Sequence, residues 1–149
     1  MQINEITAEK LFSDPQFPEL IEEYAQECAL AGLPPPFPHR GIYNALERVG
    51  ALTTLAALRD GKLVGFMALL ISMNPHYSQL IATSESLFVA KAHRSSGAGA
   101  KLLKTAEKLS RERGAVGFLV SAPFGGPLAT VLQNSRDWEY TNCVFLKVL

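Results

Sequence analysis

The sequence predicts an α+β domain with one central, mixed and mostly antiparallel sheet flanked by helices. Three observations predict it: a β-hairpin in the middle of the chain, a strand–loop–helix–strand unit after it, and helical segments before both. The chain has 149 residues, of which 48% are hydrophobic, so it has enough apolar side chains for the core of one ordinary domain. We therefore expect residues 1–149 to form a single domain.

Composition and charge exclude several classes of protein. Fourteen basic residues balance fourteen acidic ones, whereas a nucleic-acid-binding domain normally carries a basic surplus, so we expect no nucleic-acid partner. The longest apolar stretch, residues 63–73, is far shorter than the ~20 residues that cross a bilayer, and the first residues do not form a signal segment. Cys28 and Cys143 are too few for a disulfide scaffold or a zinc site. We expect a cytoplasmic protein with no membrane partner and no metal.

The first third of the chain predicts one strand and two helices. Residues 2–6 form the short strand. After Pro18 the apolar residues recur at helical spacing, and Gly32 ends that helix. A stiff proline-rich connector over residues 34–38 leads to a second helix over residues 43–49.

The middle of the chain predicts three strands. A β-hairpin covers residues 51–73, with Asp60 and Gly61 as its two-residue turn. Another strand covers residues 80–90. Strict alternation along that strand puts two sets of side chains on opposite faces: Glu85, Leu87 and Val89 on one, and Ser84, Ser86 and Phe88 on the other.

The last third predicts a long helix from about Gly97 to Arg113, which Gly114 ends. A short strand over residues 116–120 and a short helix over residues 128–134 follow. Residues 138–149 predict a final strand. Its apolar side chains recur with a period of two: Trp138, Tyr140, Val144, Leu146 and Val148.

The segment that joins the strand over residues 80–90 to the long helix carries the chemistry. It reads Arg-Ser-Ser-Gly-Ala-Gly over residues 94–99. Its glycines let the backbone approach a ligand, and the free amides at the helix start favour an anion such as a diphosphate. A Walker A loop is excluded because no Gly-Lys-Ser/Thr follows, and a Rossmann fingerprint is excluded because Leu102 replaces its third glycine.

The remaining pattern, Arg-x-x-Gly-x-Gly from Arg94 to Gly99, resembles the pyrophosphate loop of the acetyl-CoA-dependent N-acetyltransferases of the GNAT superfamily. The resemblance extends over roughly residues 52–149, because the hairpin, the strand before the loop and the helix after it stand in that family's order. It implies a GNAT-like acyl-CoA N-acyltransferase fold. It also implies acetyl-CoA as co-substrate, no metal, and an acceptor amine on a small molecule or peptide.

The resemblance also implies roles for particular residues. Glu85 would be the catalytic base that removes a proton from the acceptor ammonium, directly or through a water. The backbone of the strand after it would pair with the pantetheine arm of the cofactor and polarise the thioester carbonyl. The implied cofactor-binding residues are Leu87, Phe88 and Val89 of the strand, and Arg94, Ser95, Ser96, Gly97, Ala98 and Gly99 of the loop.

Gln133 departs from the family's pattern. Many relatives carry a tyrosine there that protonates the leaving thiolate, and a glutamine is no general acid. Either the thiolate leaves unprotonated or another residue serves, with Tyr140 and Tyr77 as candidates by residue type alone. Two hypotheses follow: an N-acetyltransferase, which Glu85 favours, and a CoA-binding module with weak or lost catalysis, which Gln133 favours. The sequence does not name the acceptor, and the apolar final strand would allow a homodimer.

Overall fold

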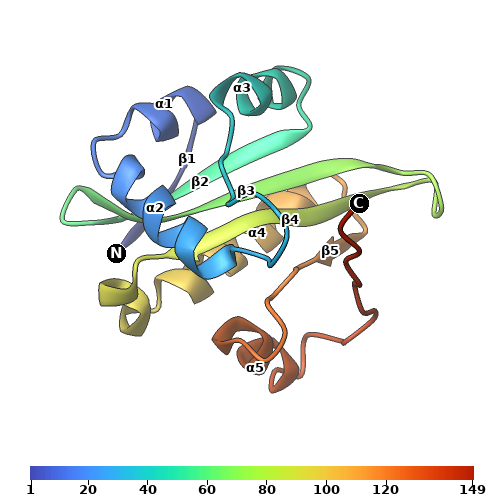
Figure 1. Ribbon diagram of the computed structural model, residues 1–149. Coiled ribbons are helices and arrows are strands. Elements are labelled where there is room, and N and C mark those ends of the chain that lie inside the picture. Colours follow the sequence, from blue (N-terminus) through green and yellow to red (C-terminus); the bar gives the residue numbers. More distant parts are fainter.

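Five strands form one sheet in the order β1-β2-β3-β4-β5 in the computed structural model, which describes residues 1–149 (Figure 1). Neighbouring strands are antiparallel, except that β4 and β5 are parallel. The predicted mixed and mostly antiparallel sheet is therefore confirmed. The strands are β1 (Gln2–Ile6), β2 (Leu52–Arg59), β3 (Lys62–Asn74), β4 (Gln79–Val89) and β5 (Gly117–Leu119).

Helices cover both faces of the sheet (Figure 1). Three of them, α1 to α3, lie on one face, α4 lies on the other, and α5 lies beyond β5. A 3₁₀ turn, η1, joins β4 to α4. None of these helices combines the length and the apolar character that crossing a membrane requires. The helical elements are α1 (Ala8–Ser13), α2 (Phe17–Cys28), α3 (Arg40–Arg48), η1 (Lys91–Ser96), α4 (Ala98–Glu112) and α5 (Pro127–Gln133).

Turn chemistry accounts for the hairpin and for the end of the long helix. Asp60 and Gly61 both have positive φ, at 52° and 76°, which is the backbone of a type I′ turn and confirms the predicted connection between β2 and β3. Gly114 has φ 84° directly after α4, as expected of a residue that ends a helix in the left-handed conformation.

The helices differ from the prediction in three places. Helix α2 ends at Cys28 rather than at Gly32, because the backbone is already extended at Ala29, with ψ 131°. Helix α1 was not expected, because six residues are too few to show a periodic apolar pattern. Its signal is the N-cap Thr7, whose side chain accepts a hydrogen bond from the Lys10 backbone N–H at 3.2 Å. Helix α3 begins at Arg40, three residues before the predicted start at residue 43.

The predicted final strand over residues 138–149 is wrong. These residues form no strand, and Val144 and Phe145 are 89% and 90% exposed. Tyr140 Oη and Cys143 Sγ, three residues apart, lie 2.7 Å from each other, whereas alternation along a strand would place these two side chains on opposite faces. An alternating pattern predicts a strand but does not show which neighbouring strand it would pair with. Strand β5 has only three residues with which a further strand could pair.

The core has a layer on each face of the sheet. On one face, Leu102 and Ala106 of α4 are fully buried in a cluster with Leu55 and Met67 of the sheet. On the other face, Phe17 and Leu20 of α2 pack in a cluster with Phe66 and Phe88. The two layers fix β4 between α2 and α4.

Close contact between β3 and β4 depends on Gly65. A Cβ added there would lie 2.7 Å from the Phe88 carbonyl oxygen and 3.1 Å from Val89 Cγ2. We expect Gly65→Ala to lower the free energy of unfolding by about 1–3 kcal/mol, because two strands must move apart. Urea denaturation measures this.

Gly41→Ala is the matched control. Gly41 lies in α3, where an added Cβ would meet only the His39 ring, which is free to move. This variant should be as stable as the wild type or more stable. Wild-type stability of Gly65→Ala would contradict the close approach of the two strands.

Candidate acetyl-transfer site

Strands β4 and β5 part soon after they meet. They pair over only three residues, from Ile81 opposite Gly117 to Thr83 opposite Leu119. One further contact follows, a 3.0 Å hydrogen bond from the Ser121 backbone N–H to Ser84 Oγ. From residue 86 to residue 89, β4 is therefore paired with β3 alone, and its other edge is free.

Backbone direction decides which groups the free edge offers. The Ala90 N–H donates to the Val64 carbonyl oxygen at 3.0 Å, so alternate residues before Ala90 also point toward β3. Leu87 and Val89 point their backbone groups to the free edge. The Val89 carbonyl already accepts a 3.0 Å hydrogen bond from Arg94 Nε. The available groups are the N–H and C=O of Leu87 and the N–H of Val89, while Phe88 turns its backbone to β3 and its side chain to α2.

The start of α4 presents free backbone amides. The first bond of this helix runs from the Lys101 N–H to the Gly97 carbonyl at 3.1 Å, so the N–H groups of residues 98–100 have no partner within the helix. Gly97 has φ 76°, and a Cβ built there would meet nothing within 4 Å. Space for a ligand and N–H donors of a helix start therefore occur together, which suits an anion.

The other predicted loop residues differ in which of their polar groups are free to bind a ligand. Ser95 is exposed, whereas the Ser96 hydroxyl donates to the His93 carbonyl oxygen at 2.5 Å. Ala98 is fully buried in the core against the sheet, so it offers only its backbone. Gly99 is half-buried, with space for a Cβ at 4.0 Å from Val89 Cγ2.

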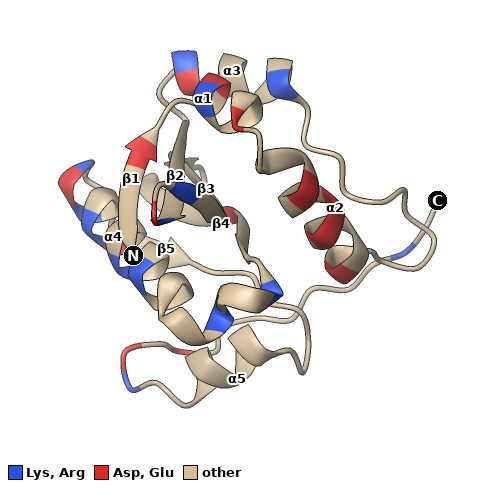
Figure 2. Cartoon of the chain, turned by 90° about the vertical axis from the view of Figure 1, so that its left-hand side faces the viewer, with Lys and Arg blue, Asp and Glu red and all other residues tan.

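The side chain of Arg94, a residue of η1, packs against α2 rather than over the start of α4. Its Nη2 is 2.6 Å from Glu27 Oε2, and its guanidinium carbon lies 5.5 Å from the centre of the Phe88 ring. Lys91 Nζ pairs with the same carboxylate at 3.2 Å. Figure 2 shows the acidic residues along α2, of which Glu27 pairs with these two cations of η1. Burial opposes the charge on Glu27, but the hydrogen bonds from Arg94 and Lys91 hold its pKa below the usual value.

Glu85 lies in a β-bulge. Ala68 pairs with Ser86 and Leu69 with Ser84, so Glu85 is an extra residue with no partner on β3. The bulge breaks the predicted alternation: the Glu85 carboxylate turns to the α3 face, whereas the Leu87 side chain packs in the cluster on the α4 face. Glu85 is exposed.

Tyr43 is the partner of Glu85, and sequence reasoning missed it. Its hydroxyl donates to Glu85 Oε2 at 2.5 Å. Burial, the hydrogen bond to Glu85 and the charge of that carboxylate raise the pKa of Tyr43 well above its usual value. No local signal marks a contact between residues 42 positions apart in the chain.

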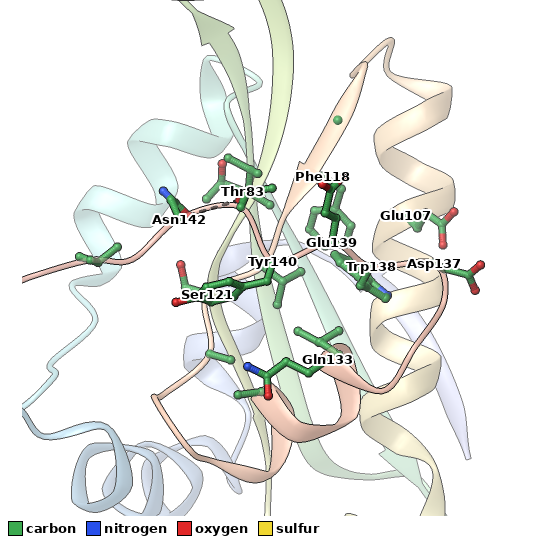
Figure 3. A pocket seen from close by; sticks show the side chains of 18 of the residues that line it. Thr83, Glu107, Phe118, Ser121, Gln133, Asp137, Trp138, Glu139, Tyr140 and Asn142 are labelled. Atoms are coloured by element: carbon green, nitrogen blue, oxygen red, sulfur yellow. Dashed lines mark hydrogen bonds between the residues drawn. The ribbon is translucent and has the colours of Figure 1, made fainter.

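Gln133 lines the pocket that Figure 3 shows, a cavity of about 870 Å³ between β5, the end of α4, α5 and the chain after α5. Tyr140 lines the same pocket. Its hydrogen bond with Cys143 and the charge of that thiol raise the pKa of Tyr140. Tyr77 lies in the turn between β3 and β4 and is 63% exposed. No group of three or more His, Cys, Asp or Glu residues is placed to hold a metal ion.

The fold and this site agree with one family. Residues 16–124 match the Acetyltransferase (GNAT) family, so the chain belongs to the GNAT acetyltransferases, as the sequence predicted. It is thereby classed as an acyltransferase of the N-acetyltransferase type. No curated protein matches the chain by sequence.

Solved structures share this fold at low sequence identity. A ribosomal-protein-alanine N-acetyltransferase from Brucella melitensis biovar Abortus 2308 is 21% identical, with a TM-score of 0.65 over 97% of this chain and 100% of that one. An aminoglycoside acetyltransferase from an uncultured soil metagenomic sample, in complex with sisomicin, is 19% identical, with a TM-score of 0.74 over 99% and 95% of the two chains. An aminoglycoside N-acetyltransferase in complex with CoA is 15% identical, with a TM-score of 0.71 over 98% and 97%.

Tyr24 makes the stability of the fold depend on pH in the alkaline range. Burial, and after it the charges of Cys28 and Glu85, raises the pKa of Tyr24 to about 12. Because the usual value is about 10, its contribution to stability is constant below about pH 10 and is lost as the pH rises toward 12. We expect the free energy of unfolding to fall by at most ~1.4 kcal/mol per pH unit from this residue in that window.

Urea denaturation between about pH 9 and about pH 11 measures this dependence. Tyr24→Phe keeps the ring that packs on Phe66 and Phe88 and should show a shallower fall. Tyr77→Phe, at an exposed position, is the control and should fall like the wild type. Equal slopes for all three proteins would contradict the role of Tyr24.

Proposed function

We infer that this chain transfers an acetyl group from acetyl-CoA to a primary amine of a small molecule or peptide. One observation carries the proposal: the free edge of β4 lies next in the chain to a helix start whose amides have no partner. An edge strand and a helix N-terminus are the two backbone devices that bind an extended amide-containing arm and a diphosphate.

The residues present fit acetyl-CoA. The N–H groups of Leu87 and Val89 and the Leu87 carbonyl would hold the pantetheine arm, and the amides of residues 98–100 would hold the diphosphate. The open space over Gly97 leaves room for the phosphate groups. When bound, acetyl-CoA supplies the acetyl group as an activated thioester. The Leu87 N–H at the free edge would polarise the thioester carbonyl.

Glu85 is the proposed base. An acceptor amine arrives mostly as ammonium at neutral pH and must lose a proton before its nitrogen can attack. The exposed Glu85 carboxylate accepts that proton, directly or through a water. Gln133 would supply at most a hydrogen bond to the departing sulfur, since it has no acidic proton.

Arg94 would support cofactor binding indirectly, by holding the neighbouring backbone in place. Its guanidinium is committed to Glu27 and to the Val89 carbonyl, so it fixes η1 and the end of β4 beside the start of α4. Ser95, exposed at the same turn, is the side chain of the loop that stands free to meet a phosphate oxygen.

The acceptor belongs to one of two chemical classes. The structural relatives include an enzyme named for ribosomal-protein alanine and one solved with sisomicin, which represent a peptide amine and a small polyamine. We propose that one domain, residues 1–149, carries the reaction in the cytoplasm, with no nucleic acid, membrane or metal taking part. The homodimer that a final strand would have allowed loses that support, because residues 138–149 form no strand.

The second candidate function is a CoA-binding module with weak or lost catalysis. Gln133 at the end of α5, where many relatives carry the acidic tyrosine, favours it. Release of free CoA thiol from acetyl-CoA in the presence of sisomicin or a peptide with an N-terminal alanine separates the two. Amine-dependent thiol release supports the enzyme, and tight binding without release supports the module.

Gly97 provides a test of cofactor binding in which only charge changes. Asp and Asn both tolerate its positive φ, and a Cβ there meets nothing within 4 Å. We expect Gly97→Asp to bind acetyl-CoA at least about 10-fold more weakly than Gly97→Asn, because the added carboxylate repels the diphosphate. Calorimetry measures both affinities. Equal affinities for the two variants and the wild type would contradict a diphosphate at this helix start.

Glu85→Gln tests the base. Turnover should fall by about 10²- to 10⁴-fold with acetyl-CoA affinity nearly unchanged, and the loss should shrink at high pH, where the amine deprotonates without help. Glu112→Gln, at the far end of α4, is the control and should keep the wild-type rate. Equal rates for wild type and Glu85→Gln from about pH 6 to about pH 9 would remove Glu85 from the mechanism.

A further inference from the structure

The hydrogen bond from Tyr43 is the one hydrogen bond that the side chain of the proposed base, Glu85, makes. Glu85 takes part in no ion pair, and its Oε1 has no hydrogen-bond partner. The Tyr43 hydroxyl occupies the other oxygen, Oε2, at 2.5 Å. One oxygen of the carboxylate is thus held by the protein while the other stays open.

Tyr43 itself is fixed from several directions. Its side chain is 5% exposed, and its ring packs edge-on against Phe12 of α1 with centroids 5.3 Å apart. Ala8, Leu52 and Ala68 complete the cluster around it. The Ala8 backbone N–H, which donates to Glu47 Oε1 at 3.0 Å, ties α3 to α1. A hydroxyl held this firmly gives its acceptor a defined position.

The bulge in β4 and Tyr43 depend on each other. The extra residue at Glu85 turns its carboxylate toward α3, where Tyr43 receives it. A buried hydroxyl without a partner is costly, so Tyr43 in turn favours the bulged conformation of β4. The ionisable groups that act on the Tyr43 hydroxyl are Glu85 and Tyr24, and the uncharged Ser86 hydroxyl lies beside it.

We propose that Tyr43 is the positioning residue of the acetyl transfer, holding Glu85 by Oε2 so that Oε1 receives the proton of the acceptor amine. This inference rests on the proposed function. In the step, one proton leaves the acceptor nitrogen and binds Oε1, and the electron pair of that N–H bond stays on nitrogen for the attack. The Tyr43 proton remains on its oxygen throughout, because burial and the nearby carboxylate raise the pKa of Tyr43.

Tyr43→Phe tests the inference, since it keeps the ring against Phe12 and removes only the donor. With acetyl-CoA and the acceptor that gives thiol release, we expect kcat/KM to fall by about 10- to 100-fold. The loss should shrink at high pH, where the acceptor amine deprotonates without help from Glu85. Acetyl-CoA affinity should be unchanged. Tyr24→Phe, which removes another hydroxyl on this face of the sheet, should keep the wild-type rate.

A double-mutant cycle distinguishes positioning from a merely structural role. In Glu85→Gln, the added Tyr43→Phe should cost little more activity, because an amide is no base and its exact position no longer matters to proton removal. Glu85→Asp shortens the carboxylate arm on an exposed side chain and draws it away from Tyr43, so it should lower kcat in the same way, even where Tyr43→Phe folds poorly.

The outcomes separate the inference from the proposed function. Loss of activity in Glu85→Gln, together with a wild-type rate and pH profile in Tyr43→Phe, would overturn the role of Tyr43 alone. Losses that add in the double variant, or a wild-type kcat in Glu85→Asp, would also overturn it. Wild-type protein that releases no thiol with any amine would overturn the proposed function, and the inference with it.

Discussion

The site depends on the early parting of β4 and β5. Three paired residues hold the two strands together, and the Ser121–Ser84 hydrogen bond marks where they separate. A longer β5 would pair with the edge of β4 and consume the backbone groups of Leu87 and Val89. The parting also leaves the start of α4 next to that edge, because the two elements are joined by a single 3₁₀ turn.

Packing on both faces keeps this opened edge in place. Helix α4 is fixed by Leu102 and Ala106 on one side, and the aromatic side chains of α2 hold Phe88 on the other. The Arg94–Glu27 pair then links α2 to the turn before α4. An exposed ion pair of this kind adds little stability, so its part is to set the position of the turn.

Much of the fold could be predicted from the sequence, because its signals are local. Asp60 and Gly61 specify their turn by positive φ, and the period of α4 specifies its buried face. Gly97 also has a positive φ, and it marks the start of α4 in the same way. The bulge at Glu85 and its contact with Tyr43 could not be predicted, since both arise only when α3 packs on the sheet. The final strand failed because an alternating pattern does not supply a partner edge.

The central claim is that the free edge of β4 and the start of α4 together hold acetyl-CoA. Residue-resolved amide hydrogen exchange with and without acetyl-CoA tests it most directly. The account predicts slower exchange on binding at Leu87, at Val89 and at the amides of residues 98–100, because each gains an acceptor. Protection elsewhere in the chain, with these amides unchanged in the presence of saturating acetyl-CoA, would contradict it.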